Sequence, residues 1–159
     1  DSILPFLDAL VVIRETHSEL YNKIEIHFYF SSDWMIDEVR ERKLSNIYFN
    51  KLLAPSKFNE IAYNFDYLLI FLPKHLKDYI ITKNTDYLPL KKPIIICSKI
   101  GEPSKNIVTK KIGIHLNTEN ELSPQIINLI ENKPKLTKDN YATLIDKYNL
   151  QNVTNQLLN

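Results

Sequence analysis

Short apolar segments alternate with amphipathic helical patterns along this chain, and this alternation limits its fold more than any other feature. Five segments rich in β-branched and aromatic residues have the length and character of strands: residues 24–30, 46–49, 67–72, 93–98 and 112–116. Apolar residues at helical spacing occupy the segments before, between and after them: residues 3–20, 33–43, 55–65 and 119–132. Strands that alternate with helices form βαβ units with parallel strands.

The strand segments 67–72 and 93–98 are apolar at almost every position. Such strands belong in a parallel sheet that helices cover on both faces. The sequence therefore predicts an α/β fold with one doubly wound, Rossmann-like parallel sheet in a three-layer α/β/α arrangement. The tail, residues 138–158, predicts one or two further amphipathic helices.

Length and composition predict a single domain and exclude several classes of protein. The chain has 159 residues, 44% of them hydrophobic, so it can bury a core. Its net charge of +1 argues against nucleic acid as a partner, and the longest apolar run is shorter than a membrane span of ~18 residues. The first residues lie within an apolar helical pattern, so we expect a piece of a longer protein.

Cysteine and glycine usage narrows the chemistry further. A single cysteine, Cys97, permits no internal disulfide, which fits a reducing compartment such as the cytoplasm, and its apolar surroundings predict a buried core residue. Two glycines exclude the glycine-rich loops that bind dinucleotides and phosphates. The four histidines lie far apart in the sequence, and their spacing predicts no metal site.

The candidate site lies in the long segment 74–92, which follows the apolar strand at 67–72. Ligands of open parallel sheets bind outside the carboxyl ends of the strands. If Thr82 caps a short helix, Lys83 and the first-turn N–H groups face a common point that suits a phosphate, and Asp86 can accept hydrogen bonds from a ribose. Asp78 precedes this helix. The alternative interpretation is a solvated helix with ordinary surface charges.

A second free helix N-terminus is expected on the same edge. Pro103 and Ser104 follow the strand at 93–98 and favour a helix start there. We expect this N-terminus to be available to a phosphate or a sugar.

The segment 82–96, TKNTDYLPLKKPIII, resembles the donor-site segment of the GT-B glycosyltransferases of the bacterial group 1 type. In these enzymes a lysine, an acidic residue, Tyr-Leu, Lys-Pro and an apolar strand recur in this order. The weaker resemblance of the remaining segments spans nearly the whole chain. It implies that residues 1–159 form a single sugar-nucleotide-binding domain, the C-terminal half of a GT-B enzyme. The family's first strand and its N-terminal acceptor domain are not in this chain.

The resemblance also implies roles for four residues. Asp86 stands in the place of the acid that binds the ribose hydroxyls, and Thr82 and Lys83 stand beside the diphosphate. Asp78 stands in the place of the first acid of the paired-acid motif in retaining enzymes, near the donor sugar, and is the catalytic candidate. The resemblance implies no metal and no cofactor, and the nucleotide-diphosphate sugar is the donor substrate.

The function expected from this resemblance is sugar transfer from a nucleotide-diphosphate sugar to a glycan or lipid-linked acceptor, with retention of configuration. We expect the isolated fragment to be inactive, because the acceptor domain is not part of it. The full-length protein is expected in the cytoplasm, where it could associate peripherally with the inner face of the membrane. Two alternatives stay open: a nucleotide-sugar epimerase of the related fold, and a non-catalytic, flavodoxin-like binding domain.

Overall fold

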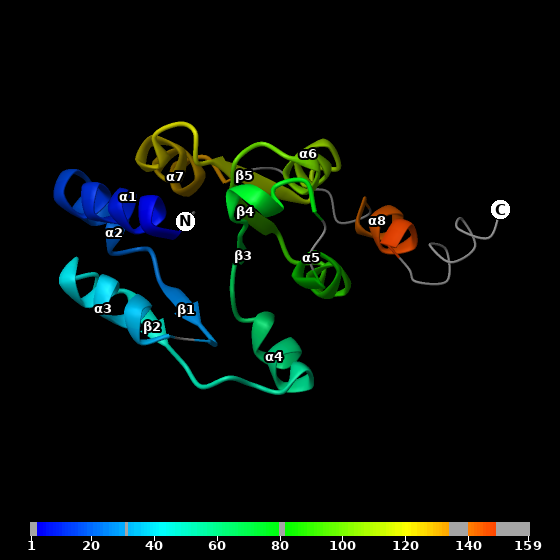
Figure 1. The fold of residues 1–159 in the computed structure, drawn as a ribbon, viewed down its shortest axis with the longest axis horizontal. Coiled ribbons are helices and arrows are strands. Elements are labelled where there is room, and N and C mark those ends of the chain that lie inside the picture. Colours follow the sequence, from blue (N-terminus) through cyan, green and yellow to red (C-terminus); the bar gives the residue numbers. More distant parts are fainter. Residues whose placement is uncertain (1–2, 31, 80–81, 134–139, 149–159) are drawn as a thin grey trace.

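The computed structural model describes residues 3–30, 32–79, 82–133 and 140–148, which form an α/β fold (Figure 1). Its strands are β1 (Ile26–Phe28), β2 (Ile47–Phe49), β3 (Leu68–Phe71), β4 (Ile94–Ser98) and β5 (Gly113–Asn117). All five lie where the apolar segments predict them. Their pairing is parallel throughout, with β1 beside β2 and with β4 between β3 and β5.

The five strands form two sheets, whereas the sequence predicted one. A two-stranded sheet holds β1 and β2, and a three-stranded sheet has the order β3-β4-β5. The break falls between β1 and β3, which are outer strands of their sheets. A local apolar pattern specifies that a segment is a strand, but its neighbours in the sheet are set by long-range packing. The described residues thus show parallel α/β units in two small sheets.

The helices of the described residues alternate with these strands in chain order. They are α1 (Ile3–Thr16), α2 (Ser18–Tyr21), α3 (Asp33–Glu41), α4 (Pro55–Ala62), α5 (Thr82–Tyr87), α6 (Glu102–Thr109), α7 (Leu122–Glu131) and α8 (Asn140–Tyr148). Two 3₁₀ turns, η1 (Lys74–Leu76) and η2 (Leu88–Leu90), flank α5. The predicted helices at 33–43, 55–65 and 119–132 are confirmed as α3, α4 and α7, each of which is shorter than its predicted range. Of the predicted tail, the described part is α8, and residues 138–139 and 149–158 lie outside the described residues.

The core is built around β4, whose five residues are all buried. Side chains of a strand point alternately to its two faces. Ile95 and Cys97 accordingly join one apolar cluster, which includes residues of α1, α3 and α7. Ile94 and Ile96 join a second cluster with residues of α6 and α8. Cys97 is fully buried, as predicted, and burial raises the pKa of its thiol to about 12.

Two arginines link α3 to α1 through hydrogen bonds. The guanidinium of Arg42 donates to Asp8 of α1 at 2.8 Å and also pairs with Glu38. Arg14 of α1 reaches back and donates to the carbonyl oxygen of Lys43 at 2.9 Å. Carbonyl groups that follow a helix lack intrahelical donors, so Arg14 satisfies a group at the end of α3.

The last described helix, α8, is held by a buried tyrosine. The Tyr141 hydroxyl donates to the carbonyl oxygen of Ile112 at 3.0 Å, and burial raises the pKa of Tyr141 to about 12. Asn140 donates to the carbonyl oxygen of Lys110 at 2.7 Å. Both contacts attach α8 to the turn between α6 and β5.

Lysines take the left-handed backbone conformation at turns where glycine is usual. Lys43, Lys91 and Lys111 have φ values of 54°, 49° and 52°. After α3 and α6 the N–H of the residue beyond the lysine bonds back to an earlier helix carbonyl, which is the pattern of a Schellman turn. A side chain in this conformation costs roughly 1–2 kcal/mol per residue.

Lys91→Gly is therefore expected to raise the free energy of unfolding. Lys91 is exposed and has a left-handed backbone at the end of η2, so relief of strain exceeds the entropy that glycine adds to the unfolded chain. We expect a net gain of about 0.5–1 kcal/mol in urea denaturation. The control is Lys57→Gly within α4, which is expected to lose about 0.5–1 kcal/mol. A loss of stability in Lys91→Gly would contradict this interpretation.

Within the described part of the chain, every helix is too short or too polar to cross a membrane.

Candidate functional site

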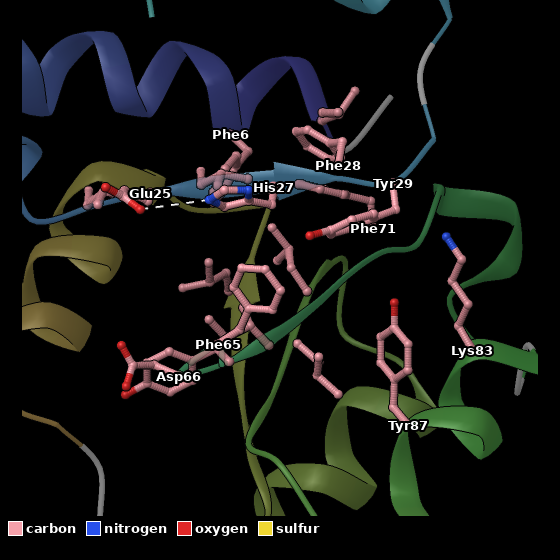
Figure 2. A pocket seen from close by; sticks show the side chains of 18 of the residues that line it. Phe6, Glu25, His27, Phe28, Tyr29, Phe65, Asp66, Phe71, Lys83 and Tyr87 are labelled. Atoms are coloured by element: carbon pink, nitrogen blue, oxygen red, sulfur yellow. Dashed lines mark ion pairs between the residues drawn. The ribbon is translucent and has the colours of Figure 1, made fainter. Parts of the chain in front are cut away.

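A groove of about 2010 Å³ runs between the two sheets, with β1 on one side and β3 on the other (Figure 2). It is larger than the ~300–1,000 Å³ typical of a small-molecule pocket. One end reaches Glu25 and Asp66, which precede β1 and β3, and the other reaches Tyr29 and Pro73, which follow them. The second end lies at the carboxyl edge of the strands, where parallel sheets bind their ligands.

Lys83 and Asp86 both line this groove, one helical turn apart on α5. Both side chains are exposed. Figure 2 shows Lys83 beside Tyr87, with the ammonium and the hydroxyl directed toward the part of the groove where Tyr29 lies. Residues three apart on a helix share a face, which explains why both enter the same groove. The structure thus brings together two of the four residues that the sequence singled out.

Thr82 is the first residue of α5, so the predicted helix begins at the predicted place. α5 has six residues and continues into η2, which corresponds to the helix expected over 82–88. A helix this short carries a small dipole. In this site the ammonium of Lys83 is consequently a stronger attraction for an anion than the end of the helix.

Aromatic side chains form a wall of the groove that the sequence reasoning missed. Phe58 of α4 and Tyr87 of α5 stack with ring centroids 5.9 Å apart, and Tyr29 meets Phe58 edge-on, also at 5.9 Å. Burial, and then the neighbouring charge of Asp86, raises the pKa of Tyr87. These rings come from three separate segments of the chain. Phe58 lies in the segment 55–65, whose spacing predicts an amphipathic helix, and no local pattern signals that its side chain faces a groove.

Asp78 lies beside the start of α6. Its carboxylate pairs with the Lys77 ammonium at 2.6 Å. This hydrogen bond holds the pKa of Asp78 below its usual value, and the backbone N–H of Glu102 and the charge of Lys105 act in the same direction. Asp78 is exposed and is not part of the groove lining.

The N-terminus of α6, expected to be free for a phosphate or a sugar, is occupied by the chain itself. The Gly101 N–H donates to the Ser104 hydroxyl at 3.1 Å, and that hydroxyl donates to the Gly101 carbonyl at 3.0 Å. The Asp78 carboxylate accepts from the Glu102 N–H. Contrary to the expectation of a free terminus, side chains of the chain itself thus bind the N–H groups of Gly101 and Glu102.

Glycine is required at position 101 by a close approach of two backbone segments. A Cβ atom there would lie 1.8 Å from the carbonyl oxygen of Lys77 and 3.1 Å from the Asp78 carboxylate. The absence of a side chain thus lets η1 pack against the start of α6. This contact explains why Asp78 meets α6 and not α5.

Lys92, part of the Lys-Pro motif in segment 82–96, supports the fold beside the groove. Its ammonium donates to the carbonyl oxygens of Tyr63 and Phe65, each at 2.7 Å. Both carbonyls follow α4, and carbonyl groups at the end of a helix lack intrahelical N–H donors. Lys92 therefore joins the end of α4 to the start of β4 and leaves Lys83 as the lysine of the motif that lines the groove.

Two of the histidines, His115 and His27, lie in strands and contact neighbouring groups. His115 of β5 contacts the Ser98 carbonyl oxygen through Nε2 at 2.9 Å, and burial lowers its pKa. His27 of β1 stacks on Tyr48 with ring centroids 4.8 Å apart. His75 is exposed on η1. Among the described residues, no group of three or more His, Cys, Asp or Glu side chains could hold a metal ion.

Comparison with protein-family models and with curated protein sequences finds no match to this chain.

Proposed function

We propose that this chain binds a nucleotide-diphosphate sugar at the carboxyl edge of its strands and is the donor-binding half of a GT-B glycosyltransferase. The observation that supports the proposal is that Lys83 and Asp86, one turn apart on α5, both line the groove. A cation and a carboxylate so placed suit a ligand with a phosphate at one end and a hydroxyl-bearing sugar at the other. The resemblance of segment 82–96 to the donor-site segment of these enzymes supports the same assignment.

Each groove residue has a chemical role in this proposal. The Lys83 ammonium stabilises the diphosphate and the charge that grows on it as the sugar leaves. Thr82 lies beside the same phosphates, and Asp86 accepts hydrogen bonds from the ribose hydroxyls. The rings of Tyr87 and Phe58 offer apolar surface to the rest of the ligand.

Asp78 is assigned a place near the donor sugar by the resemblance alone. The Lys77 ammonium and the start of α6 keep its carboxylate ionised, which suits electrostatic stabilisation of a positively charged sugar transition state. Transfer with retention of configuration requires an acceptor, a glycan or a lipid-linked sugar, and an N-terminal domain to hold it. The proposal includes a doubly wound, three-layer sheet and a cytoplasmic enzyme at the inner face of the membrane.

Asp86→Ala is expected to weaken binding of the preferred nucleoside diphosphate by about tenfold to a hundredfold. Removing the carboxylate leaves the ribose hydroxyls without a charged acceptor. A hydrogen bond to a charged group contributes about 1.5–3 kcal/mol, and each 1.4 kcal/mol changes the affinity about tenfold. Lys83→Ala is expected to weaken binding of the diphosphate more than binding of the nucleoside. This loss of affinity is expected to become smaller as the salt concentration rises. Calorimetric titration with UDP, GDP and ADP measures both effects.

The matched controls are two exposed residues outside the groove lining. Asp37→Ala removes a carboxylate from α3, and Lys57→Ala removes an ammonium from α4. Both are expected to bind as the unaltered chain does. Equal affinities for the unaltered chain and Asp86→Ala, with both proteins folded, would remove Asp86 from the site.

A further inference from the structure

Tyr87 extends the face of α5 that lines the groove. It follows Lys83 by four residues and Asp86 by one, and all three residues line the groove. Residues four apart on a helix are neighbours on its surface, with Cβ atoms about 5–6 Å apart. Figure 2 shows the Lys83 ammonium and the Tyr87 hydroxyl directed toward the same part of the groove, where Tyr29 lies. Two hydrogen-bond donors, one charged and one uncharged, thus face one region of the groove.

The Tyr87 ring is held in position by its neighbours. It stacks on Phe58 of α4 with an angle of 18° between the ring planes. It also packs against two buried apolar clusters, one that includes residues of α4 and β3 and one that includes residues of β4 and α6. A side chain that is already fixed loses less conformational entropy when a ligand binds. The ring therefore places its hydroxyl at the groove before a ligand binds.

The Tyr87 hydroxyl and the Lys83 ammonium are both available to a ligand. Within the part of the chain that the structure describes, neither group donates a hydrogen bond to another group of the protein. Burial, and then the charge of Asp86, raises the pKa of Tyr87 above its ordinary value. The hydroxyl consequently keeps its proton at neutral pH and can donate it.

Two such donors suit an anion that carries several acceptor oxygens. A phosphate group presents neighbouring oxygens, so an ammonium and a hydroxyl can bind the same group. Hydrogen bonds to an ionised acceptor are roughly twice as strong as those between neutral groups. The Asp86 carboxylate on the same helix is an acceptor only and repels a phosphate. The face of α5 therefore offers two donors to a phosphate and one acceptor to hydroxyl groups.

We propose that Tyr87 is a phosphate-binding residue, whose hydroxyl donates to the same phosphate group as the Lys83 ammonium. This inference rests on the proposed function and adds to it, because the proposed function uses only the ring of Tyr87. The hydroxyl makes the site selective for a nucleoside diphosphate over the nucleoside through an uncharged donor, beside the charged donor of Lys83.

The test is calorimetric titration of Tyr87→Phe with UDP, GDP or ADP, whichever the unaltered chain binds most tightly. Phenylalanine keeps the ring and its stack on Phe58 and lacks only the hydroxyl. The control is Tyr63→Phe, which removes a hydroxyl from an exposed tyrosine outside the groove lining. Inorganic pyrophosphate and the nucleoside are measured separately, by displacement of the bound diphosphate. Thermal unfolding checks that both variants are folded.

We expect Tyr87→Phe to weaken binding of the diphosphate and of pyrophosphate by about tenfold or more, since a donor to a charged acceptor is lost. Binding of the nucleoside is expected to stay the same, and Tyr63→Phe is expected to bind all three as the unaltered chain does.

Two results would overturn this inference alone. One is an unchanged affinity of Tyr87→Phe for the diphosphate, while Lys83→Ala still weakens it. The other is an equal loss for the nucleoside and the diphosphate, which would place the hydroxyl at the ribose or the base. Binding of no diphosphate by the unaltered chain would overturn both the inference and the proposed function.

Discussion

Ile96→Ala is expected to lower the free energy of unfolding by about 2–5 kcal/mol. The Ile96 side chain is 0% exposed and lies in the middle of β4, the central strand of the three-stranded sheet. Its cluster joins β4 to β3 through Ile70 and to α8 through Leu144. The smaller side chain loses these contacts and leaves a cavity, because close-packed surroundings relax only in part.

Urea denaturation followed by circular dichroism measures this loss. The control is Ile100→Ala, an isoleucine that is 46% exposed beyond the end of β4, where a change within about 0.5 kcal/mol is expected. Similar losses in the two variants would show that β4 is not the centre of the core.

Gly113→Ala is the second change with a large expected effect, a loss of about 3 kcal/mol or more. A Cβ atom at Gly113 would lie 2.1 Å from the Ile94 carbonyl oxygen and 3.0 Å from the Ile107 side chain. Ile94 is paired with Gly113 in the β4–β5 ladder, so its oxygen cannot move without disturbing that ladder. Overpacking against a side chain destabilises a protein by about 1–3 kcal/mol. A clash with a backbone carbonyl destabilises it more, because the carbonyl cannot move to another rotamer as a side chain can.

Thermal unfolding and the yield of folded protein check this prediction. The matched control is Asn117→Ala at the other end of β5, a half-buried residue, where we expect a smaller loss. A Gly113→Ala protein as stable as the unaltered chain would mean that β4 and β5 lie farther apart than described.

The strands and most helices could be predicted from the sequence because their signals are local. The continuous apolar run at 93–98 predicted a strand covered on both faces, and β4 is buried at every position. The break between β1 and β3 could not be predicted from such patterns. It depends on which strands are neighbours, and Ile26 or Leu69 would have the same apolar character with a partner strand or without one.

The candidate site was predicted in part, for the same physical reason. Lys83 and Asp86 share a face because they lie one turn apart on one helix, which spacing alone reveals. Asp78, which the resemblance places near the donor sugar, lies against the start of α6, and the close approach at Gly101 that positions it there has no local sequence signal. The rings of Tyr29, Phe58 and Tyr87 meet from three segments, so their shared wall emerges only in the folded chain.

The most direct test of the proposed function is calorimetric titration of the folded chain with UDP, GDP and ADP, each compared with its nucleoside. The account predicts saturable one-to-one binding of at least one diphosphate, tighter than its nucleoside and weakened by both Asp86→Ala and Lys83→Ala. The account would be contradicted if no diphosphate bound at concentrations up to about 1 mM, which corresponds to a binding free energy of about 4 kcal/mol. It would also be contradicted if neither substitution changed the binding.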